Sequence, residues 1–247
     1  MRYLARPPAW NHPALGRAFL HELAGVGPPP PPAADLRPFY LPVRNQFNEG
    51  CCSGFSTAAL REGVLAMLHG PSSVQYLSPA YLYARTRMTE GSFPADVGAV
   101  VADELTTLKN FGACLESQLP YTANPTEAPT PECDAAAQAF RIPSFAQVQT
   151  SDPLYLEAAI SGGQAVVFAM DIRPSFERTG PDGMVPDPAP GEQSLGGHAM
   201  LAVGYDRSSG RLTVRNSWSS NWGSGGYCFL PYSLISSFFE AWTIPLA

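Results

Sequence analysis

The chain carries the sequence NQFNEGCCSGF at residues 45–55, where two adjacent cysteines precede a helical pattern. From Cys52 to His69, apolar side chains recur at three- and four-residue steps, and a Gly-Pro pair follows as a stop signal. We therefore predict a long helix over residues 52–69 with Cys52 in its first turn. The positive end of a helix dipole favours a thiolate over a thiol, so the sequence marks Cys52 as a candidate nucleophile.

Composition excludes several classes of protein. The chain has 247 residues, of which 45% are hydrophobic and 15% charged, as in a folded protein. The net charge is −6 and the sequence contains no Lys/Arg block, so we expect no nucleic-acid partner. No apolar run approaches the roughly 18 to 20 residues of a membrane span, and no secretory leader is visible, which leaves the compartment open. We expect a monomer without a metal or cofactor.

The cysteines do not form an obvious framework. Their number, five, is odd, so at least one remains a free thiol or pairs outside the chain. Cys114 and Cys133 flank a Pro/Thr-rich stretch and would be able to close a surface loop, but the sequence does not decide this.

The first half of the chain reads as helical and the second as β-rich. Further helices are predicted over residues 78–87 and 98–110, and the Pro/Thr-rich stretch at residues 120–133 reads as a crossover between lobes. After it come short apolar or alternating runs that we predict as strands, at residues 164–171, 198–205, 211–215 and 227–230. The arrangement is α+β, with a helical lobe at about 45–120, a β-rich lobe at about 135–247 and a site between them.

The first 32 residues form a separate segment ahead of the main domain at 33–247. Leu15, Phe19 and Leu23 lie four residues apart, on one face of a predicted short helix over residues 14–24. A polyproline linker follows at Pro28–Pro32. Two interpretations stay open: a solvated tail, or a segment docked on the main domain.

A thiol nucleophile needs a base, and the chain has four histidines. His69 lies seventeen residues down the predicted helix from Cys52, about 25 Å away, which excludes it. His12 and His21 fall in the proline-broken leader, whereas His198 opens a predicted strand after a Gly-Gly turn, where an imidazole can be held rigidly. His198 is therefore the candidate base.

Three further residues complete a candidate active site. Asn216, eighteen residues after His198, is able to orient the imidazole ring without adding a charge. Trp218 would shield that hydrogen bond from water. Gln46, six residues before Cys52, would donate its side-chain amide, together with the Cys52 backbone N–H, to the oxyanion that forms when a carbonyl is attacked.

With these residues assembled, the chain resembles the papain-like cysteine peptidases from about Asp35 to Ala247. The interval of 146 residues from Cys52 to His198 is typical of that family. The matching motifs, in chain order, are Asp35-Leu36-Arg37, Pro42-Val43-x-Asn45-Gln46, Leu77-Ser78-Pro79, Gly112 with Pro120-Tyr121, GGHAMLAVGY at 196–205 and VRNSWSSNWGSGGY at 214–227.

The resemblance implies a two-lobe fold, with a helical left lobe, a β-barrel right lobe and the active site in the cleft between them. It implies hydrolysis of a peptide or protein substrate: Cys52 attacks the peptide carbonyl, His198 protonates the leaving amine, and the acyl-enzyme is hydrolysed. The family register also selects Cys52 over Cys51, because the nucleophile stands six residues after Gln46 and two after Gly50.

The resemblance further implies which residues contact the substrate. The loop leading into the third predicted helix places Gly98 and Ala99 against the substrate backbone, and the Gly197 carbonyl faces it from beside His198. We also expect Gly50, Cys51 and Trp218 to line the substrate site.

Two departures from the family pattern bear on function. Ser53 stands where the family has an aromatic residue, and Glu49 where many members have a disulfide cysteine. They motivate one alternative, a binding module without activity; a second alternative is an acyl transferase that uses the same residues. Residues 1–32 are short for an inhibitory prosegment, yet we hypothesise that they occupy or flank the cleft and restrain the enzyme.

Overall fold

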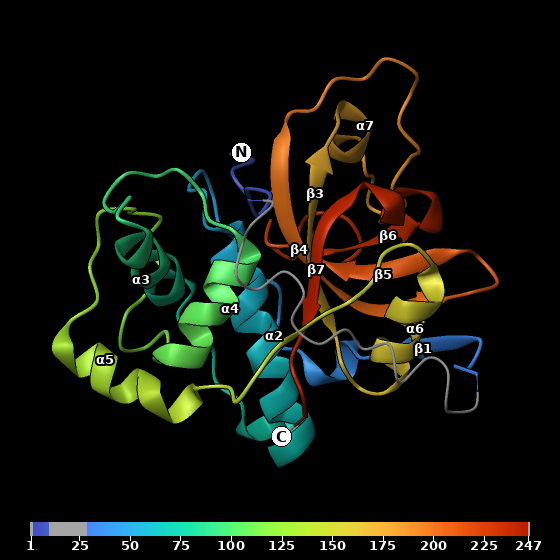
Figure 1. Ribbon diagram of the computed structural model, residues 1–247. Helices are drawn as coiled ribbons and strands as arrows, with labels where there is room; N and C mark the ends of the chain where they lie inside the picture. The colour runs from blue at the N-terminus through green and yellow to red at the C-terminus, as the bar shows by residue number, and fades with distance from the viewer. Residues whose placement is uncertain (1, 10–28, 247) are drawn as a thin grey trace.

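The computed structural model describes residues 2–9 and 29–246, which form a helical lobe and a sheet lobe (Figure 1). The predicted helix over residues 14–24 lies outside the described residues. One hydrophobic core continues through both lobes, from Leu60 and Leu105 in the helical lobe to Phe168 and Trp242 in the sheet. The predicted two-lobe α+β fold is confirmed.

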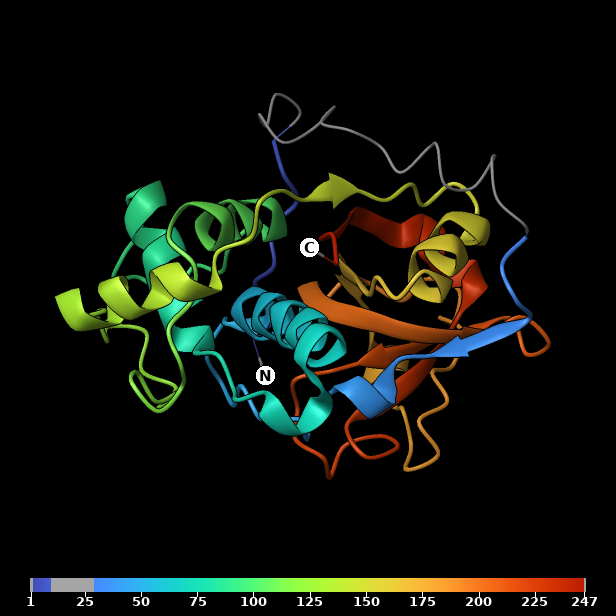
Figure 2. The ribbon, with the colours of Figure 1, turned by 90° about the horizontal axis from the view of Figure 1, so that it is seen from below.

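The central helix lies between the two lobes. It is α2 (Cys52–His69), with the bounds that the sequence predicts, and it is buried along most of its length between the other helices and the sheet (Figure 2). It ends at Gly70, whose φ of 91° is a conformation that few other residues adopt. The remaining helices of this lobe are α3 (Pro79–Glu90), α4 (Val101–Asn110) and α5 (Pro131–Ala137), with 3₁₀ turns at Pro71–Ser73 and Gln138–Phe140.

The sheet lobe is built on one antiparallel sheet in the order β2-β7-β3-β4-β5-β6, with β1 paired to β4. The two ends of this order do not pair within the described residues, so the sheet is open and not closed into the predicted barrel. The strands are β1 (Ala33–Asp35), β2 (Ala146–Gln147), β3 (Val166–Ile172), β4 (Gly196–Asp206), β5 (Arg211–Arg215), β6 (Tyr227–Pro231) and β7 (Phe238–Thr243). Helices α6 (Pro153–Ser161) and α7 (Pro174–Glu177) and 3₁₀ turns at Arg37–Phe39 and Tyr232–Ser237 complete the lobe.

The start of α4 is held by the opposite lobe. Val100 provides no side-chain cap, and the Glu240 carboxylate of β7 instead accepts hydrogen bonds from the backbone N–H groups of Val101 at 2.9 Å and Ala102 at 3.2 Å. Trp242 donates its indole N–H to the same carboxylate at 2.8 Å. This contact fixes the loop before α4 relative to the sheet.

The structure also shows the state of the cysteines, which the sequence leaves open. All five cysteines are buried and free, so Cys114 and Cys133 do not form a disulfide in this structure.

Among the described residues, no helix has the length and apolar character needed to cross a membrane.

We predict that the protein loses stability as the pH rises from 6.5 to 8. Burial raises the pKa of Glu104 to about 8 and that of Glu240 to about 7. The folded state therefore keeps protons that the unfolded chain releases near pH 4 to 5, and this stabilisation is lost as the pH rises through the folded pKa values. The slope is up to about 1.4 kcal/mol per pH unit for each proton.

Urea unfolding at several pH values measures this slope. Glu104→Gln should flatten it, and Glu132→Gln, the same change at an exposed position of α5, should not. A stability that is constant or rising over this range in the unmodified chain would contradict the prediction.

Candidate active site

The structure brings three of the predicted residues to the boundary between the lobes. Cys52 is the first residue of α2, His198 the third residue of β4, and Asn216 directly follows β5. His198 Nε2 lies 2.8 Å from Asn216 Oδ1, which also accepts the Ser217 backbone N–H at 2.8 Å. Since an amide oxygen only accepts, Nε2 carries the hydrogen and Nδ1 is the basic atom of the ring.

Aromatic side chains cover this hydrogen bond. The Trp218 ring stacks on His198 with centroids 4.9 Å apart, and Phe176 and Trp222 pack against Trp218. His198 is fully buried and Trp218 is 5% exposed. Trp218 therefore lies where the sequence analysis expects a shield against water.

The Cys52 sulfur is buried, and burial opposes the thiolate that the start of a helix favours. Burial raises the pKa of Cys52 to about 11, although the backbone N–H groups of Ala199, Ser53 and Ala5 partly offset it. Burial lowers the pKa of His198 to about 4, and its Nδ1 has no hydrogen-bond partner in the described part of the chain. In this arrangement burial favours the neutral form of both side chains.

The neighbouring cysteine has a different environment. Cys51 Sγ points into the helical lobe, where it donates to the Pro79 carbonyl at 3.5 Å and packs against Phe55 and Tyr83. Of the two adjacent cysteines, Cys52 is the one at the boundary with the sheet. The Cys51 thiol faces the interior of the helical lobe, so a contact with substrate would come from its backbone.

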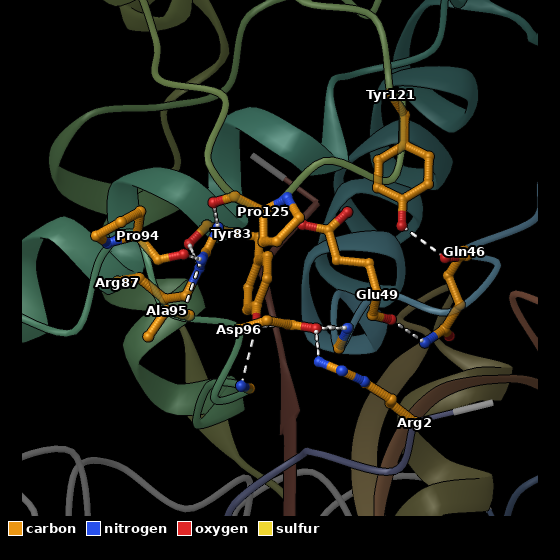
Figure 3. Close-up of polar contacts among 12 residues, drawn as sticks. Arg2, Gln46, Glu49, Tyr83, Arg87, Pro94, Ala95, Asp96, Tyr121 and Pro125 are labelled. Atoms are coloured by element: carbon orange, nitrogen blue, oxygen red, sulfur yellow. Dashed lines mark hydrogen bonds and ion pairs between the residues drawn. The ribbon is translucent and has the colours of Figure 1, made fainter.

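Gln46 is fixed on three sides. Its side-chain oxygen accepts from Ser217 Oγ at 2.5 Å. Its Nε2 donates to the Glu49 carbonyl at 3.0 Å, and its own carbonyl accepts from Tyr121 at 2.6 Å (Figure 3). An amide nitrogen carries two hydrogens, and Glu49 uses one of them. The second remains available to an oxyanion.

Residues 2–9 run between the two lobes at this site, as the dark blue trace in Figures 1 and 2 shows. The Ala5 N–H donates to the Gly197 carbonyl at 2.8 Å, and the Arg6 N–H donates to the Ala99 carbonyl at 3.2 Å. Both carbonyls belong to residues that the sequence analysis assigns to substrate binding.

Three glycines predicted to contact substrate lie directly against this segment. A Cβ atom at Gly98 would lie 1.7 Å from the Leu4 carbonyl oxygen, and one at Gly50 would lie 2.6 Å from Leu4 Cδ1. Gly197 is equally close, because a Cβ there would lie 2.0 Å from the Ala5 carbonyl oxygen. A side chain at Gly98 or Gly197 would displace the backbone of the segment, whereas one at Gly50 would meet the side chains of Leu4 and Asp96.

Polar side chains anchor the same segment to both lobes. Arg2 pairs with Asp96 at 2.7 Å and Arg6 pairs with Glu90, both in the helical lobe. Tyr3 donates to Glu177 of α7 at 2.5 Å, and its ring meets His198 edge-on with centroids 5.9 Å apart. Every residue from Arg2 to Arg6 thus contacts a wall of the cleft.

Asp96 and Tyr83 are functional positions that the sequence analysis missed. Asp96 accepts from the Gly50 N–H at 3.0 Å and from the Tyr83 hydroxyl at 2.6 Å, and that hydroxyl accepts from the Gly98 N–H at 2.9 Å (Figure 3). The pair connects the loop before Cys52 to the strip of Gly98 and Ala99, which the sequence analysis expects to contact substrate. Neither residue belongs to a recognisable sequence motif. The only indication in the sequence is that Asp96 lies two residues before Gly98.

Comparison with known proteins identifies the family. The family model of papain family cysteine proteases matches residues 31–233. The chain belongs to the papain family of cysteine proteases.

Two relatives and one solved structure illustrate the family. An uncharacterized peptidase C1-like protein of Acanthamoeba polyphaga mimivirus is 29% identical over 169 residues, covering 64% of this chain and 54% of its own. Cysteine protease 1 of Oryza sativa subsp. japonica is 29% identical over 242 residues, covering 91% of this chain and 45% of its own. The chain therefore spans about half the length of these two relatives. The crystal structure of xylellain, a cysteine protease from Xylella fastidiosa, has a TM-score of 0.81 at 26% identity and covers 98% of this chain and 91% of that one.

We predict that Cys52 in the full-length chain reacts slowly with iodoacetamide at pH 7. With a pKa raised from 9.0 to about 11, its thiolate fraction is roughly 100-fold below that of an ordinary cysteine, and the side chain is buried. Peptide mapping after timed alkylation measures the rate, and alkylation in urea gives the reference rate. Rapid labelling of Cys52 in the folded chain would contradict this assignment.

Proposed function

We propose that the protein is a cysteine peptidase that hydrolyses peptide bonds of peptide or protein substrates through Cys52, His198 and Asn216, and that residues 2–9 restrain it. One observation carries the proposal: the His198–Asn216 hydrogen bond leaves the basic Nδ1 atom without a partner among the described residues, and the backbone N–H of the next residue, Ala199, contacts the Cys52 sulfur. Family membership supports the reaction class.

In the proposed reaction, departure of the segment readmits water and lowers the desolvation cost of charge. The Cys52 thiol then transfers its proton to His198 Nδ1 and forms an ion pair. The thiolate attacks the peptide carbonyl, and the second Gln46 hydrogen and the Cys52 N–H stabilise the oxyanion. His198 gives the proton to the leaving amine as the C–N bond breaks, and water hydrolyses the resulting thioester.

The proposed restraint follows from what the segment presents to the sulfur. The Ala5 N–H points toward Cys52, and no carbonyl of residues 2–9 accepts a hydrogen bond from Gln46 or from the Cys52 N–H. No carbonyl group of residues 2–9 is therefore held by the donors proposed for the oxyanion. The segment therefore blocks the cleft without being positioned for cleavage.

Ala5→Pro should release the restraint, because proline has no N–H to donate to Gly197 and its ring would clash with that carbonyl. We expect iodoacetamide to label Cys52 at least about 30-fold faster at pH 7, with a parallel rise in peptide hydrolysis. Ala9→Pro makes the same change at an exposed position and should alter neither rate. Cys52→Ala should abolish hydrolysis. A folded Ala5→Pro chain with unchanged labelling would refute the restraint.

Gln46→Ala, introduced with Ala5→Pro, should lower kcat by about 100- to 1000-fold, the usual effect of losing an oxyanion donor. Alkylation of Cys52 forms no oxyanion, so its rate should stay within about threefold. Ser217→Ala is the matched control, because it removes the Ser217–Gln46 hydrogen bond and leaves the amide donor. If Ser217→Ala lowers kcat as much as Gln46→Ala does, the result would contradict the proposed role of the Gln46 side-chain amide as an oxyanion donor.

A further inference from the structure

The Arg6 side chain occupies an acidic position on the helical wall of the cleft. Its guanidinium pairs with Glu90, the last residue of α3. The Asp103 carboxyl of α4 lies within hydrogen-bonding reach of Glu90, and Glu104 lies close enough to affect it electrostatically. Arg6 thus brings a cation to a group of carboxyl groups contributed by two packed helices.

The position of the Arg6 backbone connects this acidic group to the substrate path. The Arg6 N–H donates to the Ala99 carbonyl, on the strip proposed to hold the substrate backbone. A residue that makes this backbone contact has Glu90 within reach of its side chain, because Arg6 makes both contacts at once. Ala5, beside the Cys52 sulfur, is its immediate neighbour.

The same pairing recurs at the other end of the segment. Arg2 binds Asp96, whose side chain is only 8% exposed and whose other oxygen holds Gly50 and Tyr83. Departure of the segment would leave both Glu90 and Asp96 facing the cleft without their arginines. Two partly buried carboxylates that lose their cations create a strong preference for new ones.

We propose that the substrates are cationic peptides, and that Glu90, with Asp103 beside it, binds an arginine within a residue or two of the bond that is cleaved. This inference rests on the proposed peptidase function and adds its substrate class. Arginine is favoured over lysine because its planar fork pairs with a carboxylate through two hydrogen bonds. Glu90 is a specificity residue in this account, since it contacts the substrate side chain and takes no part in bond breaking.

The test uses the full-length Ala5→Pro chain and fluorogenic peptides that carry arginine or citrulline, its uncharged isostere, at each position in turn. At one position we expect kcat/KM to be about tenfold higher with arginine. Glu90→Gln should abolish that preference, and Glu132→Gln, the same change on exposed α5, should preserve it. Equal rates for the two peptides at every position, or a preference that survives Glu90→Gln, would overturn the proposal.

A binding measurement separates failure of this inference from failure of the peptidase function. If the Ala5→Pro chain cleaves no peptide, the proposed function fails, and calorimetry on the Ala5→Pro/Cys52→Ala chain decides the arginine site alone. The probe is the peptide MRYLARPPA, with citrulline replacing its second arginine in the control. About tenfold weaker binding of the control supports the site. Equal affinity, or no binding of either peptide, overturns it.

Discussion

The site depends on a short run of backbone contacts, in which residues 3–6 lie between Gly197 of the sheet lobe and Ala99 of the helical lobe. Glycines make this approach feasible, because no side chain at Gly98 or Gly197 would leave room for the Leu4 and Ala5 carbonyls. The segment covers Cys52 and His198, and its side chains form ion pairs or hydrogen bonds with carboxylates on both walls of the cleft. The raised pKa of the thiol, the lack of a partner for His198 Nδ1 among the described residues and the pairing of Arg2 and Arg6 accompany that placement.

The magnitudes explain why the start of a helix does not suffice to ionise Cys52. Burial raises the pKa of this thiol from 9.0 to about 11, a free-energy difference of about 3 kcal/mol against the thiolate. A helix dipole contributes at most about 2 kcal/mol, and only in favourable geometries. In the proposed mechanism, ionisation therefore needs a hydrated site and a protonated imidazole partner, and movement of the segment would provide both.

Sequence reasoning predicted what local patterns encode and missed what depends on contacts between distant residues. The bounds of α2 were predictable because its apolar period and Gly-Pro stop are local, and His198 and Asn216 followed from neighbouring glycine and strand patterns. Strand β7 was missed, although it supplies the Glu240 cap of α4, because its burial depends on packing against both lobes. Asp96, Glu90 and Glu177 were missed for the same reason: each gains its role from a residue at least 84 positions away in the chain.

The central claim is that the covered site holds a neutral imidazole whose hydrogen is on Nε2. Nitrogen-15 NMR of the His198 ring at pH 7 tests it most directly, because the two nitrogens have distinct shifts in each protonation state. We predict a neutral ring with the hydrogen on Nε2 in the full-length chain, and an imidazolium in the Ala5→Pro chain. An imidazolium in the full-length chain at pH 7 would contradict the account, since Cys52 would then be ionised beneath the segment.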